Sequence, residues 1–175
     1  MKKTLILSLI TASSLFAGNL VVTQGIVKAH TEVFGDSTIN PSTRSITSHL
    51  HMAKTVESIR GSVDVSVLKL KSDNETRDEH MVEALESHTY PVAQYTFKNV
   101  SKTSSGYVID GILKFHNVKK PLRIDAQIST QGNRIEIRGK GSFTLSDYHI
   151  KPIRLFLLTV RDRIDLNIDV TLKKQ

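Results

Sequence analysis

At 175 residues the chain is long enough for one domain with a buried core, and its lack of cysteine excludes disulfides, a thiolate nucleophile and a cysteine-bound metal. The formal charge is +7, from 24 Lys and Arg against 17 Asp and Glu. Because basic residues alternate with acidic ones, as at Arg134, Glu136 and Arg138, they predict a mixed solvated wall rather than a nucleic-acid-binding stripe, with attraction to anionic lipid head groups as the alternative.

The first 17 residues have the order of a signal peptide. Lys2 and Lys3 precede an apolar run over residues 5–16, and Ala17 followed by Gly18 offers a small-residue cleavage site. A buried N-terminal helix is the alternative. The order of a charged start, an apolar run and small residues at its end favours export instead. Cleavage there leaves a domain of residues 18–175 and lowers the formal charge from +7 to +5, because Lys2 and Lys3 are lost.

The first part of this domain is typical of short strands. Residues 19–30 are of mixed β-type, residues 32–36 predict a short strand, and the Asn-Pro step within residues 39–43 predicts a turn. In residues 46–52 apolar and polar side chains alternate, and residues 59–67 do so strictly, which predicts half-buried strands. After Val67 the apolar phase shifts to Leu68 and Leu70, which predicts a β-bulge.

Residues 71–97 contain the one clear departure from strand periodicity. Ser72 and Glu75 have the spacing of a capping box, which predicts a helix start. Met81, Val82 and Leu85 then give a short helix one apolar face. The helix is expected to end before Pro91, because the residue before a proline favours extended geometry.

Further alternating strands follow the helix, and a Gln-Gly-Asn sequence at residues 131–133 predicts a hairpin turn. With about eight strands, each with one polar face, the apolar faces must be hidden. The sequence therefore predicts an all-β fold with one short helix, an antiparallel lipocalin-like β-barrel with the helix over one end. The strand segments after the helix are residues 92–100, 107–115, 122–128, 135–145 and 164–172.

Four glycines, Gly61, Gly111, Gly139 and Gly141, fall on the inward phase of these strands. Each removes a side chain from the barrel interior, which either permits strong curvature or leaves space for a ligand. The sequence leaves both interpretations open.

Three segments resemble the signature of the YceI-like family across residues 59–172. The first combines residues 77–81 (RDEHM) with Tyr90–Pro91 and Phe97, the second is residues 111–121 (GILKFHNVKKP), and the third is residues 146–150 (SDYHI). Asn117 and His149 stand where the family usually has glycine. The resemblance implies a periplasmic lipocalin-like barrel, often dimeric, that holds a long-chain isoprenoid or another amphiphile.

The candidate ligand-binding residues are large apolar side chains on the inward phase, for which ordinary core packing is the alternative. Tyr95 adds a hydroxyl for a ligand head group or a buried partner. Arg77 and Asp78 are adjacent and cannot share a helix face, so we expect them mainly to fix the helix to neighbouring strands. The candidates are Val65, Val67, Met81, Leu85, Tyr95, Phe97, Ile109, Leu113, Phe115, Phe143 and Ile168.

No catalytic or metal site is predicted. His49 and His51 share a strand face at a chelating spacing, but on the polar side and with no third ligand nearby, and His80 is expected to pair with Glu79 or Glu83. No nucleophile elbow is present. The predicted function is non-enzymatic binding of a long-chain amphiphile, without a cofactor. A self-filled barrel acting in stress response or protein interaction is the first alternative, and an enzyme or chaperone-like handler acting on a lipid or quinone is the second.

Overall fold

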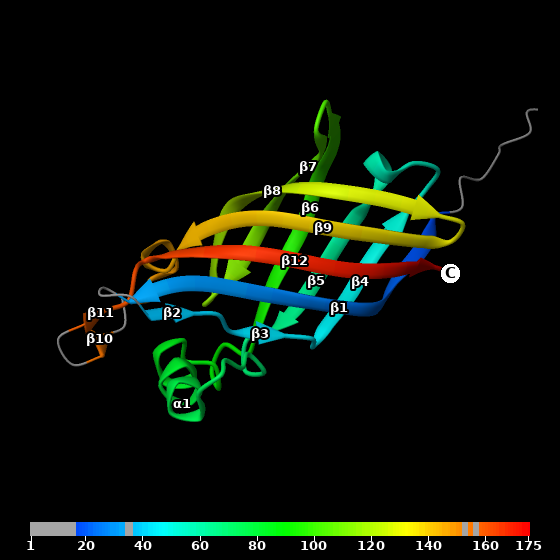
Figure 1. Ribbon diagram of the computed structural model, residues 1–175. Coiled ribbons are helices and arrows are strands. Elements are labelled where there is room, and N and C mark those ends of the chain that lie inside the picture. The colour runs from blue at the N-terminus through cyan, green and yellow to red at the C-terminus, as the bar shows by residue number, and fades with distance from the viewer. Residues whose placement is uncertain (1–16, 34–36, 152–153, 156–157) are drawn as a thin grey trace, which may run out of the picture.

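The computed structural model describes residues 17–33, 37–151, 154–155 and 158–175, so that all but the last residue of the predicted signal peptide lies outside the described part. Eight antiparallel strands form a closed barrel in the order β1, β4, β5, β6, β7, β8, β9, β12 (Figure 1). The predicted fold class is confirmed. The elements are β1 (Gly18–Val33), β2 (Ser37–Ile39), β3 (Ser42–Thr43), β4 (Ile46–Met52), the 3-10 helix η1 (Val56–Ser58), β5 (Arg60–Ser66), α1 (Glu75–Ala84), β6 (Val92–Thr103), β7 (Gly106–Phe115), β8 (Val118–Gln131), β9 (Arg134–Thr144), the 3-10 helix η2 (Ser146–Tyr148), β10 (Arg154–Leu155), β11 (Leu158–Thr159) and β12 (Arg163–Lys174).

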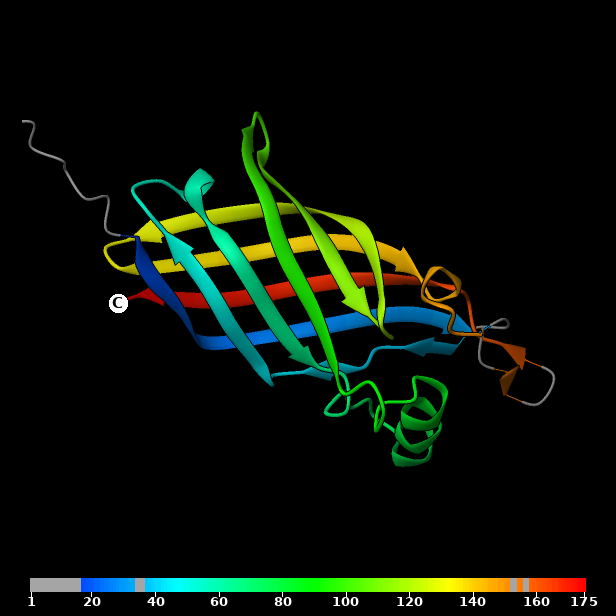
Figure 2. The ribbon, with the colours of Figure 1, turned by 180° about the vertical axis from the view of Figure 1, so that it is seen from behind.

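Two walls make up the barrel. Seen from behind, β4 to β7 cross β8, β9, β12 and β1 at a steep angle (Figure 2). The barrel closes because β1 pairs with β12 along most of its length, from Leu20 opposite Lys174 to His30 opposite Asp165, and with β4 near its start. The absence of a free edge in the barrel wall protects the strands from pairing with other chains.

Period-two alternation separates the interior of the barrel from its outer wall. On β9, Ile135 and Ile137 are buried while Arg134 is exposed. Arg134 lies 2.9 Å from Glu136, and on β12 Arg163 lies 2.8 Å from Asp165. The predicted mixed charged wall is therefore confirmed.

Two β-bulges interrupt this alternation, and neither lies at the predicted position. One is at Thr23 in β1 and the other at Lys98 in β6. The predicted bulge after Val67 is wrong, because β5 ends at Ser66 and the chain turns there, with the Leu70 amide donating to the Val67 carbonyl at 3.1 Å. The turn explains the phase shift: it redirects Leu70 towards the barrel interior.

The strand predictions before β4 also need correction. Residues 19–33 form part of one long strand, β1, rather than two short ones, because its pairing with β12 runs from residue 20 to residue 30 and pairing with β2 continues to Val33. Part of the predicted strand over residues 32–36 lies outside the described residues. The predicted hairpin turn is confirmed, since Gln131 pairs with Arg134 and Gly132 has a positive φ of 61°.

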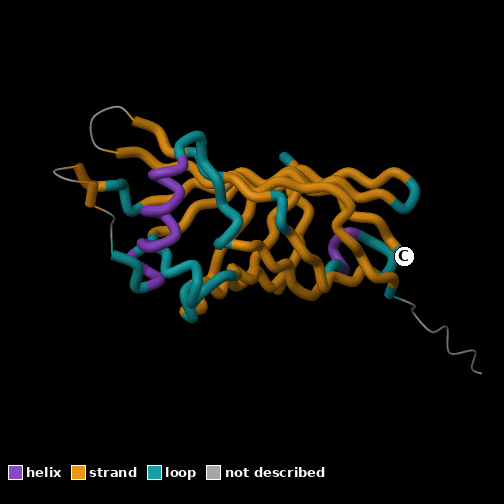
Figure 3. The backbone as a smooth tube through the Cα atoms, turned by 90° about the horizontal axis from the view of Figure 1, so that it is seen from below, coloured by secondary structure: helices purple, strands orange, loops and turns teal. Residues whose placement is uncertain are grey.

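Helix α1 lies across one end of the barrel, opposite the end where the C-terminus lies (Figure 3). The predicted cap is wrong: Asn74, not Ser72, caps the helix, and its side chain accepts from the Arg77 amide at 2.9 Å. The helix also ends earlier than predicted, at Ala84, and a series of turns joins it to β6. Within the described residues, no helix is long and apolar enough to cross a membrane.

Candidate ligand-binding site

The barrel encloses a cavity of about 220 Å³ that the inward faces of the barrel strands and α1 line. All eleven candidate residues line this cavity, from Val65 on β5 to Ile168 on β12. Their contact with a ligand stays a prediction. The alternation missed smaller lining residues, including Val27 and Ala29, because the bulge at Thr23 hides the phase of β1.

The cavity is long and narrow. On β12 every second residue from Ile164 to Leu172 lines it, which at about 3.3 Å per residue corresponds to roughly 26 Å along the strand. A volume of about 220 Å³ spread over such a length makes a channel rather than a round chamber. This shape suits a linear chain better than a fused ring system.

Among the described residues no polar atom contributes to the cavity wall, because the few polar residues around it are occupied or turned away. The Thr31 hydroxyl lies 3.0 Å from the Arg161 carbonyl oxygen. The Tyr95 hydroxyl lies 3.0 Å from the carbonyl oxygens of both Ile109 and Leu122. Of the two roles predicted for Tyr95, the structure gives it the buried partner. Burial raises the pKa of Tyr95, and the charge of Asp110 raises it further.

Neighbouring side chains fill the space left by the inward glycines. A side chain at Gly111 would overlap the Tyr95 ring, and one at Gly139 or Gly141 would overlap Ile124. At Gly61 the backbone has a φ of 113° and lies against the His49 carbonyl, so that position needs glycine for its conformation. The four glycines therefore permit close packing and tight backbone geometry, and do not supply the cavity volume.

Asp78 anchors the start of α1. It is only 3% exposed, and its carboxylate accepts from the Ser72 amide at 2.7 Å, with the Lys71 ammonium 3.8 Å away. Lys71 in turn exchanges two backbone hydrogen bonds with Ser42 in β3. The sequence predicts that Arg77 and Asp78 fix the helix to neighbouring strands, and this role is confirmed for Asp78. Arg77 instead pairs with Asp73, 2.6 Å away, and its side chain is about one quarter exposed (26%).

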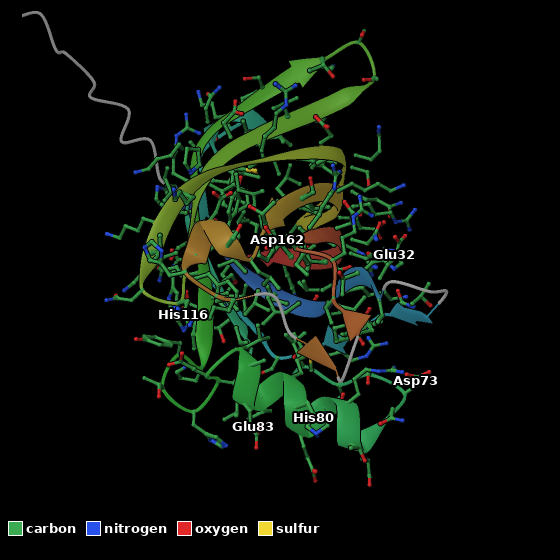
Figure 4. The ribbon with its side chains drawn as sticks, turned by 90° about the vertical axis from the view of Figure 1, so that its left-hand side faces the viewer. Glu32, Asp73, His80, Glu83, His116 and Asp162 are labelled. Carbon is green, nitrogen blue, oxygen red and sulfur yellow. The ribbon has the colours of Figure 1, made fainter. Side chains whose placement is uncertain are left out.

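The inner face of α1 closes the cavity at this end. Met81 and Leu85 are buried and line the cavity, while Arg77 and His80 contribute carbon atoms to the lining. Among the described residues His80 forms no ion pair with Glu79 or Glu83. The helix therefore presents an apolar surface to the channel and a polar one to water (Figure 4).

We expect Leu85→Ala to lower the free energy of unfolding by about 2–3 kcal/mol, because it removes a buried side chain and leaves a gap between α1 and the barrel. Denaturant titration measures the change. Glu83→Ala, at an exposed position on the same helix, serves as the control and should change stability by less than about 0.5 kcal/mol. An equally small change for Leu85→Ala would mean that α1 does not depend on this contact.

The end of the α1 segment also lies against the barrel rim. His116 lies in the turn between β7 and β8, and its Nε2 is 3.4 Å from Glu86 while its Nδ1 is 3.1 Å from the Tyr148 carbonyl oxygen. The Tyr148 side chain packs against Phe115 and is 1% exposed. Burial, with a smaller effect from Asp147, raises the pKa of Tyr148 to about 12.

This shift predicts a loss of stability at alkaline pH. Since the pKa of Tyr148 is higher in the folded protein than its ordinary value of 10, the folded state disfavours the ionised form. Stability should be unaffected below about pH 10 and should fall as the pH rises to about 12. Ultraviolet absorbance and unfolding measured across this range test it. Tyr148→Phe should reduce the loss and leave the part due to Tyr95; an unchanged loss would contradict the assignment.

Comparison with known proteins agrees with this architecture. The family model described as YceI-like domain matches residues 23–172.

The chain belongs to the YceI-like family.

Protein YceI of Escherichia coli O17:K52:H18 is 28% identical over 98 residues, which cover 51% of each chain. A UPF0312 protein of Yersinia enterocolitica is 27% identical over 97 residues, covering 51% of this chain and 50% of its own. The chain thus spans about half the length of the curated relatives it matches.

Solved structures of low sequence identity share the YceI-like fold. Burkholderia cenocepacia BcnA has a TM-score of 0.71 at 10% identity, with 84% of this chain and 95% of BcnA covered. A polyisoprenoid binding domain from Saccharophagus degradans, implicated in plant cell wall breakdown, has a TM-score of 0.69 at 10% identity, with 90% and 99% covered. The Campylobacter jejuni YCEI protein has a TM-score of 0.61 at 16% identity, with 100% and 93% covered.

The backbone explains the two positions where this YceI-like chain departs from the family's glycines. Asn117 and His149 both have a positive φ of 60°. That region favours glycine, and asparagine tolerates it better than most residues. Both turns therefore have the backbone conformation that a glycine adopts most easily.

The predicted histidine pair lies on the outer wall. His49 and His51 are exposed on β4, and His49 lies 3.6 Å from Asp64. Within the described part of the chain, no three His, Asp or Glu side chains come together as metal ligands would.

Proposed function

We propose that this protein is a non-enzymatic binder of a long-chain amphiphile, such as an isoprenoid or a fatty-acid derivative, and that it stores or carries this ligand with the chain inside the barrel. The observation that carries the proposal is the long channel with an entirely apolar wall, closed at one end by α1. A dry apolar cavity accepts apolar ligands, and each buried methylene contributes about 0.8 kcal/mol. A long chain therefore needs few polar contacts.

The likeness in fold to a polyisoprenoid binding domain supports this proposal, since that domain and this chain share one architecture. It does not extend to the identity of the ligand. No pair of side chains in the channel offers a nucleophile with an adjacent base, because the lining is apolar and its one phenol is bonded to two carbonyl oxygens. A binding role therefore fits the channel better than a catalytic one.

A second candidate, a barrel filled by its own side chains, has one observation in its favour. The cavity of about 220 Å³ is smaller than the roughly 300–1,000 Å³ of usual ligand pockets. Tyr95 and Ile124 also occupy the space that the glycines leave. Such a barrel would serve in protein interaction or stress response without a lipid.

Native mass spectrometry of the purified protein, followed by solvent extraction of the bound material, separates the two candidates. We expect a mass increment that extraction removes, and a long-chain amphiphile in the extract. The control is a variant with the channel narrowed by Ala93→Leu, which should retain less ligand because Ala93 lines the cavity. A protein that stays empty after incubation with isoprenoid and fatty-acid derivatives would favour the self-filled barrel.

We further propose export to the periplasm by a signal peptide over residues 1–17. The order of Lys2 and Lys3, an apolar run and Ala17 supports it. Sequencing the N-terminus of the protein purified from cells tests this directly. We expect the mature chain to begin at Gly18; a chain that keeps residues 1–17 would contradict export by this route.

A further inference from the structure

Three buried side-chain polar atoms among the described residues have no hydrogen-bond partner. They are the Ser87 hydroxyl oxygen, Nε2 of His116 and the Tyr148 hydroxyl oxygen. Ser87 and Tyr148 are each 1% exposed. Unpartnered buried polar groups are destabilising and uncommon, so each of them calls for a partner such as water or a ligand.

The three residues belong to one junction, which we call the rim junction: residues 86–90 after α1, the β7–β8 turn with His116, and η2 with Tyr148. His116 lies 3.4 Å from Glu86, which precedes Ser87, and its ring centroid is 4.2 Å from that of Tyr90. Its Nδ1 is 3.1 Å from the Tyr148 carbonyl oxygen. Figure 4 shows His116 on the side of the barrel end where the C-terminal part of α1 lies, away from Asp73.

The rim junction lies directly behind the cavity wall. The Tyr148 ring is 5.7 Å from the Phe115 ring and 5.3 Å from the Phe143 ring, measured between centroids. Phe115, Phe143 and Leu85, which comes two residues before Ser87, all line the cavity. A chain that fills the channel therefore ends next to the rim junction, separated from it by these side chains.

The hydrogen-bonding capacity of His116 limits the partner. A carbonyl oxygen only accepts, so His116 Nδ1 carries the hydrogen that it donates to Tyr148. In the neutral ring Nε2 is then an acceptor, and it faces another acceptor, the Glu86 carboxylate. A group with an N–H or O–H placed there would donate to one or both. The hydroxyls of Ser87 and Tyr148 can accept from such a group or donate to it.

The charges around the rim junction disfavour an anion. Three carboxylates among the described residues lie at it: Glu86 beside His116, Asp147, which accepts from Thr144, and Asp162, which accepts from the Ser146 amide of η2 at 2.8 Å. The guanidinium of Arg77 belongs to the other end of α1 and lies 2.6 Å from Asp73, so it does not compensate. A carboxylate or phosphate head would thus meet like charge in a buried place.

We propose that the rim junction is a polar subsite for the head group of the bound amphiphile, and that this head group is neutral and carries a hydrogen-bond donor, as an alcohol or a primary amide does. The inference rests on the proposed function, because it needs a chain in the channel. The channel holds the apolar chain, and Ser87, His116 and Tyr148 bind the head.

Four ligands with the same eighteen-carbon chain test this: oleyl alcohol, oleamide, methyl oleate and octadecene. The first two carry a donor, the ester carries none, and the alkene has no head group. Affinities are measured by displacement of a neutral fluorescent dye from the wild type, Tyr148→Phe, Ser87→Ala and the control Tyr107→Phe, whose hydroxyl lies outside the rim junction and the cavity lining.

We expect the wild type to bind oleyl alcohol and oleamide about fivefold to tenfold more tightly than methyl oleate, as one hydrogen bond allows. Tyr148→Phe and Ser87→Ala should remove most of this preference, leave octadecene binding within about twofold, and not lower the melting temperature of the empty protein, because each removes an unpartnered group. A purely structural role would lower the melting temperature and weaken all four ligands alike.

Two outcomes overturn the proposal, and they differ in what they leave standing. Equal affinity for all four ligands in the wild type would mean that water or nothing occupies the rim junction, while the channel still binds chains. Failure to bind any of the four, octadecene included, would overturn the proposed function and the subsite with it.

Discussion

Phe97→Arg should abolish retention of the bound amphiphile. Phe97 is 7% exposed, lines the channel and packs edge-on against Tyr95 with ring centroids 5.4 Å apart. A guanidinium at this position would lie in an apolar wall where no lining carboxylate can pair with it. Burying an unpaired charge is strongly unfavourable, so we expect both loss of ligand and a fall of roughly 3–5 kcal/mol in the free energy of unfolding.

Two control variants change the charge on the outer wall of the barrel instead of in its interior. Thr96→Arg puts a guanidinium one residue earlier on β6, on the outer face between Ser62 and Ile112, and should leave ligand retention unchanged. Arg134→Ala, which removes a charge from the outer wall, should also leave ligand retention unchanged. Lipid extraction and native mass spectrometry measure retention in each variant. If Phe97→Arg folds and keeps as much ligand as Thr96→Arg, the interior of the barrel is not the site.

Alternation along single strands was enough to predict the barrel and its lining, because inward and outward phases depend only on period two. Nine of the eleven candidate residues, from Val65 to Ile168, face the channel for this reason, whereas Met81 and Leu85 belong to the α1 segment and follow the helix period. Whether an inward side chain packs in the core or lines a cavity does not follow from this alternation. Core packing and cavity lining have the same pattern in sequence, so the channel itself could only come from the three-dimensional arrangement.

Local backbone geometry explains the errors in the prediction. The bulges at Thr23 and Lys98 change the phase of β1 and β6 without any glycine or proline to mark them. The helix start was placed at Ser72 because its spacing to Glu75 matches a capping box, but Asn74 also has a capping side chain and lies closer to the helix. Ser72 instead supplies the amide that Asp78 binds.

The rim junction could not be found from the sequence. Ser87, His116 and Tyr148 are each about thirty residues from the next, and no local pattern links them. His116 and Tyr148 lie within two different family segments, residues 111–121 and 146–150, and Ser87 lies in neither. What brings the three together is the closure of the barrel, which places the start of β8 and the end of β9 beside the segment that follows α1.

Asp78→Ala should release the start of α1 from the barrel and lower the free energy of unfolding by about 1–3 kcal/mol. The carboxylate is buried, and without it the Ser72 amide loses its acceptor at 2.7 Å. The Lys71 contact adds little, because that ammonium is largely exposed at 3.8 Å. Loss of the anchor should also speed exchange of the bound amphiphile, since α1 closes the channel at this end.

Asp78→Asn separates the hydrogen bond from the charge, because asparagine keeps an oxygen that can accept from the Ser72 amide. We expect an effect roughly half that of Asp78→Ala on both stability and exchange. Glu79→Ala is the matched control: it removes a neighbouring carboxylate that is exposed, and should change neither. Denaturant titration gives the stability, and dye displacement after rapid mixing gives the exchange rate. Faster exchange with unchanged stability would mean that Asp78 holds only the helix; lower stability with unchanged exchange would mean that the ligand leaves by the other end of the barrel.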